Sequence, residues 1–441
     1  MPFVGNFPRV GRMLSQIAPI GSLLGGVALL LLGNGLLNTL LTLRGVAEGY
    51  STGLLGLLMS GYFVGYLLGT WLTVPLIRRI GHIRAFACCA ASGAIVALLH
   101  LILVNPWVWM ALRVAYGIVL VTLYMVIESW LNARVSGDSR GRVFAVYMAV
   151  NLGALALAQQ LLNLASPLEF LLFALAGILI CAALLPITLT RQAQPTLPDT
   201  PDTRLRQLVR IAPLSVTASG LSGLALGAFW GLAPVYASQS GFDAAGVGLL
   251  MGVTILGGAV LQWPIGRYSD SHDRSKVMLC VVVLAALVAL AISLLPTGKL
   301  MLGAFFLWGG LAFSIYSIAV ARMVDQLHPD EILSGSSGLL LVNGLGSACG
   351  PLLAGLAMHL LGPRGLPLYC AAVLGLLALY TLHRLRRVSD LLSEPHAQFT
   401  PMLRTSHTVL ELMPEAPEST ADSTSGSAAA APETSKEETC T

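Results

Sequence analysis

Long apolar runs separated by short polar segments make up most of the chain. A helix of about 20 apolar residues crosses the hydrocarbon core of a bilayer, and it satisfies its own backbone hydrogen bonds there. The runs therefore predict an all-α membrane protein with twelve transmembrane helices. The expected spans are 21–43, 53–76, 84–104, 107–131, 143–166, 168–190, 213–237, 245–267, 276–296, 299–325, 336–360 and 364–384.

The pattern repeats itself in the two halves of the chain at a constant offset of 192 residues. Leucines would match by chance, but rarer residue types keep the same register from the second span to the fifth. The aligned pairs include Gly56 and Gly248, Gly65 and Gly257, Trp71 and Trp263, Gly117 and Gly309, Tyr124 and Tyr316, and Asn151 and Asn343. Each half has six spans, an even number, so both halves enter the membrane in the same orientation. Such halves are related by an axis along the membrane normal, with a substrate site between them near the midplane.

Changes in composition along the chain predict its domain organisation. Residues 191–212 form the longest internal loop and contain three prolines, which is typical of a linker. From residue 385 onward the chain is rich in Ala, Ser, Thr, Glu and Pro, which favours disorder. The expected units are a cytoplasmic N-terminal segment (1–20), an N-terminal six-helix half (21–190), a cytoplasmic linker (191–212), a C-terminal six-helix half (213–384) and a largely disordered cytoplasmic tail (385–441).

The charge content excludes a soluble protein and gives an orientation. Of the 441 residues, 56% are hydrophobic and only 10% are charged, whereas soluble domains have about 25% charged residues. Loops rich in Lys and Arg stay in the cytoplasm. With the N-terminus inside, only three of the 25 basic residues fall outside, and Arg113 lies within a span. We therefore expect a multi-pass protein of the bacterial inner (plasma) membrane with both termini cytoplasmic.

The loop after the eighth span carries a charged motif, GRYSDSHDRSKV, which begins at Gly266. It resembles the signature loop of the major facilitator superfamily, Gly-x-x-x-Asp-Arg-x-Gly-Arg-Arg. The matching or adjacent positions are Gly266, Asp270, Arg274 and Lys276. Asp273 stands where the family usually has glycine. A carboxylate at Asp270 can lie at a helix N-terminus and pair with neighbouring cations, and would then act as a latch between cytoplasmic helix ends. The alternative is a solvated turn.

The equivalent loop of the first half reads RRIGHIRAF and begins at Arg78. Arg78 takes the place of the motif's acid, while Gly81 keeps the glycine and Arg84 adds positive charge. This copy departs from the family pattern at its most important position. A latch on this half therefore needs an acid from elsewhere, or it is weak.

Two charged residues lie on the fourth span. The segment Arg113-x-x-x-Gly117 resembles the superfamily's fourth-helix motif, whose buried arginine is linked with proton coupling or substrate contact. A charge inside the membrane is a functional hypothesis by default, although Arg113 could also reach the nearby outer interface. Glu128 is the only acid well inside an apolar run. It either belongs to a cytoplasmic salt-bridge network, as at the matching place in sugar porters, or carries protons.

Several polar residues lie on spans that are expected to line a central cavity. They are Asn34, Asn38, Asn151, Gln159, Trp230, Tyr316 and Asn343. An amide in hydrocarbon needs a hydrogen-bonding partner, so bonds between helices are the competing explanation for the asparagines. The unpaired cation at Arg113 favours an anionic or polar neutral substrate over a cation.

The segment ESWLN at the end of the fourth span, with the Gly-Arg turn that follows it, resembles the YcaD-like branch of the major facilitator superfamily. The resemblance covers nearly all of residues 21–385. It implies a secondary active transporter that moves a small organic solute by alternating access and is proton-coupled. That branch does not indicate a substrate.

A buried charge on a glycine-rich helix and one intact latch loop favour transport over other functions. The alternative is a non-transporting membrane sensor or assembly factor, which the long tail would suit. We expect no enzyme activity, cofactor or metal, because the chain shows no nucleophile–base pair, phosphate-binding loop or metal-ligand spacing. The expected partners are a small-molecule substrate and membrane lipid, without nucleic acid, and the expected oligomeric state is a monomer.

Overall fold

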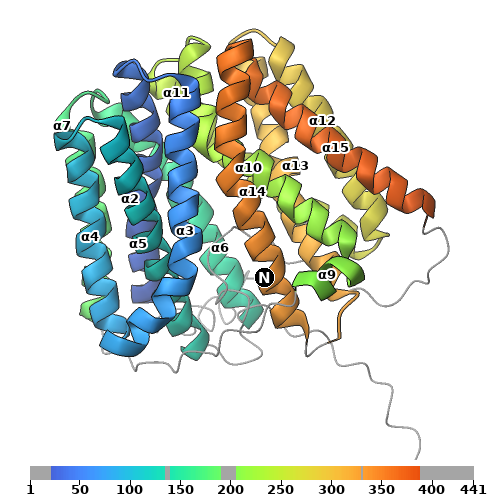
Figure 1. Ribbon diagram of the computed structural model, residues 1–441, viewed down its shortest axis with the longest axis horizontal. Coiled ribbons are helices and arrows are strands. Elements are labelled where there is room, and N and C mark those ends of the chain that lie inside the picture. Colours follow the sequence, from blue (N-terminus) through green and yellow to red (C-terminus); the bar gives the residue numbers. More distant parts are fainter. Residues whose placement is uncertain (1–20, 135–139, 190–204, 329–330, 388–441) are drawn as a thin grey trace, which may run out of the picture.

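A computed structural model gives the fold of this chain (Figure 1). It describes residues 21–134, 140–189, 205–328 and 331–387. The predicted N-terminal segment lies outside these ranges, as does the predicted tail apart from residues 385–387.

All the regular structure within the described ranges is helical, and twelve of its helices are long and apolar enough to cross a membrane. The prediction of an all-α protein with twelve spans is therefore confirmed. The long helices are α2 (Gly21–Ala47), α3 (Thr52–Ile80), α4 (His82–Ile102), α5 (Pro106–Arg134), α6 (Arg140–Gln160), α7 (Phe170–Ala182), α10 (Pro213–Gln239), α11 (Ala244–Asp270), α12 (Arg274–Leu294), α13 (Lys299–Val324), α14 (Ile332–Leu361) and α15 (Gly365–Arg387). The short ones are η3 (Leu161–Leu164), α8 (Leu184–Thr188) and α9 (Leu205–Ile211).

The two sets of six long helices, α2–α7 and α10–α15, pack with the same internal pattern. In the first set α2 packs against α6 and α7, α3 against α5, and α4 against α5 and α7. The second set repeats these pairs, with α10 against α14 and α15, α11 against α13, and α12 against α13 and α15. Between the sets, α3 packs against α14 and α6 against α11. The sequence repeat is therefore also a repeat of packing, with the two sets side by side (Figure 1).

The bundle has two ends that differ in their connections. One end holds the connections from α2 to α3, α4 to α5, α10 to α11, α12 to α13 and α14 to α15, and we call it the α2–α3 end. The opposite end, the α3–α4 end, holds the turns from α3 to α4 and from α11 to α12. Equivalent side chains begin the second helix of each set. The hydroxyl of Ser51 accepts a hydrogen bond from the Leu54 amide (3.3 Å), and the carboxylate of Asp243 accepts one from the Gly246 amide (2.8 Å). These side chains cap amides that the first helical turn leaves unpaired.

The structure differs from the expected organisation in two places, the sixth span and the linker that follows it. The expected sixth span, 168–190, is α7 followed by α8, with a break after Ala182. Pro186 explains the break, because proline lacks an amide hydrogen and its ring clashes with the carbonyl four residues earlier. The second difference is in the expected linker, 191–212, whose last part forms the helix α9. Leu208 of α9 is buried, which accounts for the helix at the edge of a polar segment.

Glycines allow two pairs of helices to cross with their backbones in contact. A Cβ atom on Gly65 of α3 would collide with the carbonyl of Val114 on α5, and one on Gly117 would collide with that of Tyr62. The second set repeats both contacts at equivalent residues, between α11 and α13. They join Gly257 to Phe306 and Gly309 to Thr254. Small residues at such crossings are typical of helices that associate in a membrane.

The outward faces of the bundle are apolar, as a lipid solvent requires. On α12, Leu284, Leu287 and Leu294 are exposed. The side chain of Trp71 on α3 is also exposed, as is that of its repeat partner Trp263 on α11. The charged side chains of Arg78 and Arg84 are also exposed, but they lie at the α3–α4 end of the bundle. This distribution places hydrocarbon around the middle of the bundle.

Candidate functional site

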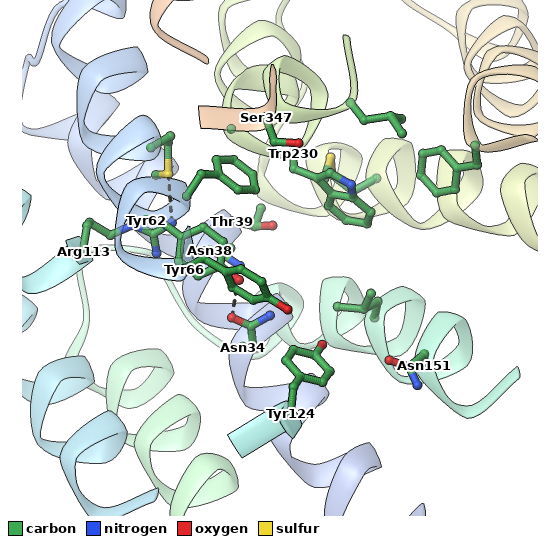
Figure 2. Close-up of a pocket in the computed structure, with 18 of the residues that line it drawn as sticks. Asn34, Asn38, Thr39, Tyr62, Tyr66, Arg113, Tyr124, Asn151, Trp230 and Ser347 are labelled. Atoms are coloured by element: carbon green, nitrogen blue, oxygen red, sulfur yellow. Dashed lines mark hydrogen bonds between the residues drawn. The ribbon is translucent and has the colours of Figure 1, made fainter. Parts of the chain in front are cut away.

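A central cavity lies between the two sets of helices, near the midpoints of the long helices (Figure 2). Its empty volume is about 1160 Å³, including space open to solvent. The structure places seven of the eight residues predicted for substrate binding or coupling in the cavity wall. They are Asn34, Asn38, Arg113, Asn151, Trp230, Tyr316 and Asn343.

The two sets contribute equivalent positions to the wall. Of the eight second-set residues that line the cavity, only Phe313 lacks a lining partner 192 residues earlier. The related pairs are Asn34 and Leu226, Asn38 and Trp230, Thr39 and Gly231, Met59 and Met251, Tyr124 and Tyr316, Asn151 and Asn343, and Leu155 and Ser347. The cavity therefore lies on the approximate twofold axis that relates the sets, where a site between inverted or parallel repeats is expected.

Arg113 of α5 is buried in the first-set side of this wall, with 2% of its surface exposed. One Nη donates to the sulfur of Met59 (3.4 Å), and the guanidinium lies 4.6 Å from the centroid of the Tyr62 ring. Its Nε and second Nη have no hydrogen-bond partner among the described residues. A sulfur atom and a ring face offset little of the cost of burying a cation. The alternative hypothesis, in which the Arg113 side chain reaches the outer interface, does not fit this buried position.

The amide side chains divide into two kinds. Asn343 of α14 donates to the carbonyl of Ser219 on α10 (3.0 Å), so the helix–helix explanation applies to it. Asn38 instead donates to the side-chain Oδ1 of Asn34 one turn away on α2 (3.2 Å), and its own Oδ1 has no partner among the described residues. Asn151 donates to the Tyr147 carbonyl within α6 (2.8 Å). The hydrogen bond between the two asparagines of α2 therefore stays within one helix.

Glu128 is the predicted residue that the cavity wall does not include. It is fully buried, and the hydroxyl of Tyr147 on α6 donates to its carboxylate (2.7 Å). Fifteen residues of helix at about 1.5 Å each separate it from Arg113, or roughly 22 Å along α5 toward the α3–α4 end. The two charges on this helix therefore have separate surroundings.

Aromatic residues of α3 and α13 line the cavity and were missed by the sequence reading. They are Tyr62, Phe63, Tyr66 and Phe313. The sequence does carry a signal, since Tyr62 and Tyr66 are one turn apart. It is ambiguous, because Trp71 on the same helix is exposed on the outside of the bundle. Only the orientation of α3 against α5 and α14 decides which aromatic residues face inward.

The motif between α11 and α12 forms an ion-pair cluster at the α3–α4 end. Arg274 is 2% exposed and pairs with Asp270 (3.1 Å) and with Asp325 at the end of α13 (2.8 Å). The expectation that Asp270 lies at a helix N-terminus is wrong, because Asp270 is the last residue of α11. Asp273 caps α12 instead, accepting bonds from the amides of Ser275 (2.8 Å) and Lys276 (3.4 Å). The unusual acid at the family's glycine position therefore takes the capping role.

The remaining predicted latch residues have simpler surroundings. Gly266 is buried in α11, and the side chain of Lys276 is exposed on α12. In the first set, Gly81 links α3 to α4 with a φ of 82°, a left-handed conformation that favours glycine. Arg78 and Arg84 are exposed on either side of it. The sequence reading missed Asp325, which lies far from the motif in the chain.

The two sets touch closely toward the α2–α3 end. A Cβ atom on Gly355 of α14 would lie 2.6 Å from the Thr52 carbonyl oxygen and 3.1 Å from the Cα of Gly56, both on α3. Beside this contact, the amide of Leu352 donates to the hydroxyl of Ser60 (3.1 Å). On the other side of the axis, a Cβ atom on Gly248 of α11 would collide with the Gln159 carbonyl of α6. These contacts bring the two sets together at the α2–α3 end.

Comparison with known proteins gives a family. A family model described as the Major Facilitator Superfamily matches residues 23–339 and 215–412. An uncharacterised MFS-type transporter, YcaD, of Escherichia fergusonii is 30% identical over 377 residues, which cover 84% of this chain and 97% of the relative. One of Enterobacter sp. (strain 638) is 31% identical over 353 residues, 79% of this chain and 91% of the relative. The crystal structure of the nucleoside transporter NupG matches with a TM-score of 0.70 at 16% identity, over 82% of this chain and 97% of that one, which shows the fold alone.

Proposed function

This chain belongs to the major facilitator superfamily, and from that premise we propose that it is a secondary active transporter for a small organic solute. One observation carries the proposal. The cavity lies at the helix midpoints and is lined at equivalent positions by both sets of helices. A solute held there contacts both sets, so a rocking motion that closes one end and opens the other transfers it without an open pore.

We assign the α2–α3 end to the outside and the α3–α4 end to the cytoplasm, because the basic residues gather at the latter. The contact of Gly355 with α3 then closes the outer entrance. In the opposite state this contact opens. The ion pairs of Arg274 with Asp270 and Asp325 then hold the cytoplasmic ends of α11, α12 and α13 together. The cavity is complete within one chain, which supports a monomer as the working unit.

We further propose that transport is coupled to protons through Glu128. This carboxylate is fully buried on the helix that carries Arg113, and it lies outside the cavity. A carboxylic acid that can exchange a proton away from the solute site allows the proton and the solute to bind at separate places. The alternative role in a structural network rests on the hydrogen bond from Tyr147.

The membrane topology can be tested with reporter fusions. A fusion after Arg387, at the end of α15, should be active only as a cytoplasmic reporter. One at Asn105, between α4 and α5, should be active only as a periplasmic reporter. The expectation follows from the asymmetric distribution of lysine and arginine. A periplasmic signal from the Arg387 fusion would exclude the twelve-span orientation with both termini inside.

Transport itself can be tested by filling proteoliposomes with a mixture of metabolites and measuring by mass spectrometry which ones leave. The wild-type protein should release at least one solute down its gradient. Asn38→Trp should reduce that release about tenfold or more, because it places the bulky residue found at the equivalent position 230 into the opposite wall. Leu287→Trp on the exposed face of α12 is the matched control and should behave like the wild type. Solute binding without release would favour the sensor alternative.

A further inference from the structure

The parts of the cavity wall that α2 and α10 form have opposite chemical character although they occupy equivalent positions. On α2 the wall residues with polar side chains are Asn34, Asn38 and Thr39. The equivalent residues on α10 are Leu226, Trp230 and Gly231. In Figure 2, Arg113, Tyr62, Tyr66, Asn34 and Asn38 gather on one side, and Trp230 projects from a helix on the other. A solute that lies between α2 and α10 therefore meets polar groups on one face and apolar groups on the other.

The polar wall carries a positive charge that the cavity does not balance. Arg113 is the only charged residue among those that line the cavity, and its equivalent in the second set, Phe305, is not among them. Two of its donor nitrogens have no hydrogen-bond partner in the described part of the chain. Leaving a buried cation unpaired is costly, so an anion that pairs with the guanidinium would bind strongly.

The number of cations limits the charge of that anion. Among the described residues that line the cavity there is no lysine, histidine or second arginine. A carboxylate matches the single planar guanidinium in both charge and geometry. A phosphate monoester would bring close to two negative charges against one positive charge and would leave the excess buried.

The apolar wall fits a flat hydrocarbon group. The rings of Trp230 and Phe313 lie 5.8 Å apart with an angle of 31° between their planes, and Met251 and Leu226 line the cavity beside them. Aromatic faces of this kind favour stacking with another ring over contact with an anionic or strongly hydrated group.

We propose that the substrate is an organic monocarboxylate with an aromatic or similarly flat apolar body. Its carboxylate binds Arg113 beside the amides of α2, and its body lies against Trp230 and Phe313. This inference rests on the proposed function, whose solute it specifies.

A panel of related probes tests the inference on the purified full-length protein. We would measure thermal stabilisation and affinity for 3-phenylpropionate, its amide, 3-phenylpropylamine, propionate and phenyl phosphate. The phenylpropionate should bind about tenfold to a hundredfold more tightly than its amide, because only the acid accepts charge-assisted bonds. The amine should bind most weakly, and phenyl phosphate should be weaker than the acid. The inference is overturned if the amide or the amine binds as tightly as the acid, or if the acid does not bind.

Three variants assign the effects to the two walls. Arg113→Gln should bring the affinities for the acid and the amide to within about threefold of each other, because the charge is gone. Trp230→Leu should weaken binding of phenylpropionate about fivefold to tenfold and leave propionate unchanged. Arg364→Gln removes a cation at an exposed connection outside the cavity. It should change neither the preference for the acid over the amide nor the affinity for phenylpropionate. An unchanged preference for the acid in Arg113→Gln contradicts the assignment.

A carboxylate introduced on a neighbouring side chain tests, without any ligand, whether Arg113 can pair with an anion. The sulfur of Met59 lies 3.4 Å from the arginine, so glutamate at this position places a carboxylate within its reach. Met59→Glu should unfold at a higher temperature than Met59→Gln, and Arg113→Gln should abolish that difference. If Met59→Glu is equally unstable with and without Arg113, the arginine has no capacity for an anion.

The outcomes separate this inference from the proposed function. Release of a neutral or cationic solute from proteoliposomes, lost in Asn38→Trp, would retain the transporter and reject the monocarboxylate. Tight binding of phenylpropionate without release of any solute would retain the anion site and reject transport.

Discussion

Replacing Gly355 with leucine is expected to impair transport strongly and to hold the protein open at its α2–α3 end. A Cβ atom at this position would already lie 2.6 Å from the Thr52 carbonyl, so the larger side chain cannot fit between α14 and α3. In a state that is open at this end the side chain has room. Each 1.4 kcal/mol of added strain shifts the balance about tenfold toward the open state, and overpacking at such a contact costs about 1–3 kcal/mol. We therefore expect transport to fall about tenfold or more.

The change of state can be measured with a cysteine in the cavity wall. Ser347→Cys would be introduced into a chain whose seven native cysteines are replaced, and labelled from outside with a membrane-impermeant maleimide. Gly355→Leu should increase the labelling rate about tenfold. Gly303→Leu is the matched control, because a side chain there meets nothing within 4 Å. Normal transport in Gly355→Leu would refute the role of this contact in closure.

The second large effect is expected at the ion-pair cluster between α11, α12 and α13. Arg274→Met keeps the length of the side chain but leaves Asp270 and Asp325 beside each other without their shared cation. Breaking a buried ion pair by removing one partner costs about 3–5 kcal/mol. We expect a large fall in the thermal unfolding temperature of the purified protein and a loss of transport.

Further substitutions separate the charge effect from a general defect. Asp325→Asn should partly restore the stability of Arg274→Met, because it removes one of the two negative charges that Arg274 pairs with. Asp270→Asn alone should be milder, about 1 kcal/mol, since the Asp270 side chain is 34% exposed. It should still impair transport more than Asp243→Asn, because asparagine can also cap α11 at residue 243. Equal transport in the Asp270 and Asp243 variants would argue against a latch.

The sequence predicts the spans well because the apolar runs are a direct consequence of the bilayer. It also predicts much of the cavity wall, since an asparagine or arginine within a span has few places where it is tolerated. The prediction fails where a residue's role depends on a neighbouring helix. Tyr62 and Trp71 are both aromatic residues of α3, yet one lines the cavity and the other is exposed on the outside.

The ion-pair cluster shows the same limit. The motif itself indicates Asp270 and Arg274, which are one turn of chain apart. Asp325 is distant in the sequence and becomes a partner only because α13 packs against α12. Pro186 is a different case, because its effect on the sixth span follows from its own chemistry and was open to prediction.

The glycine crossings of α3 with α5 and of α11 with α13 have a consequence for how such a protein diversifies. After duplication of an ancestral six-helix chain, these crossings leave no room for even a methyl group, so selection keeps them in both copies. Positions 113 and 305 already differ between the copies, so they are under no such shared limit. One copy can therefore acquire a charge at position 113 while the other keeps phenylalanine at 305, and the frame that both copies share is undisturbed. Substrate preference can evolve in one half of the molecule while the moving parts stay symmetric.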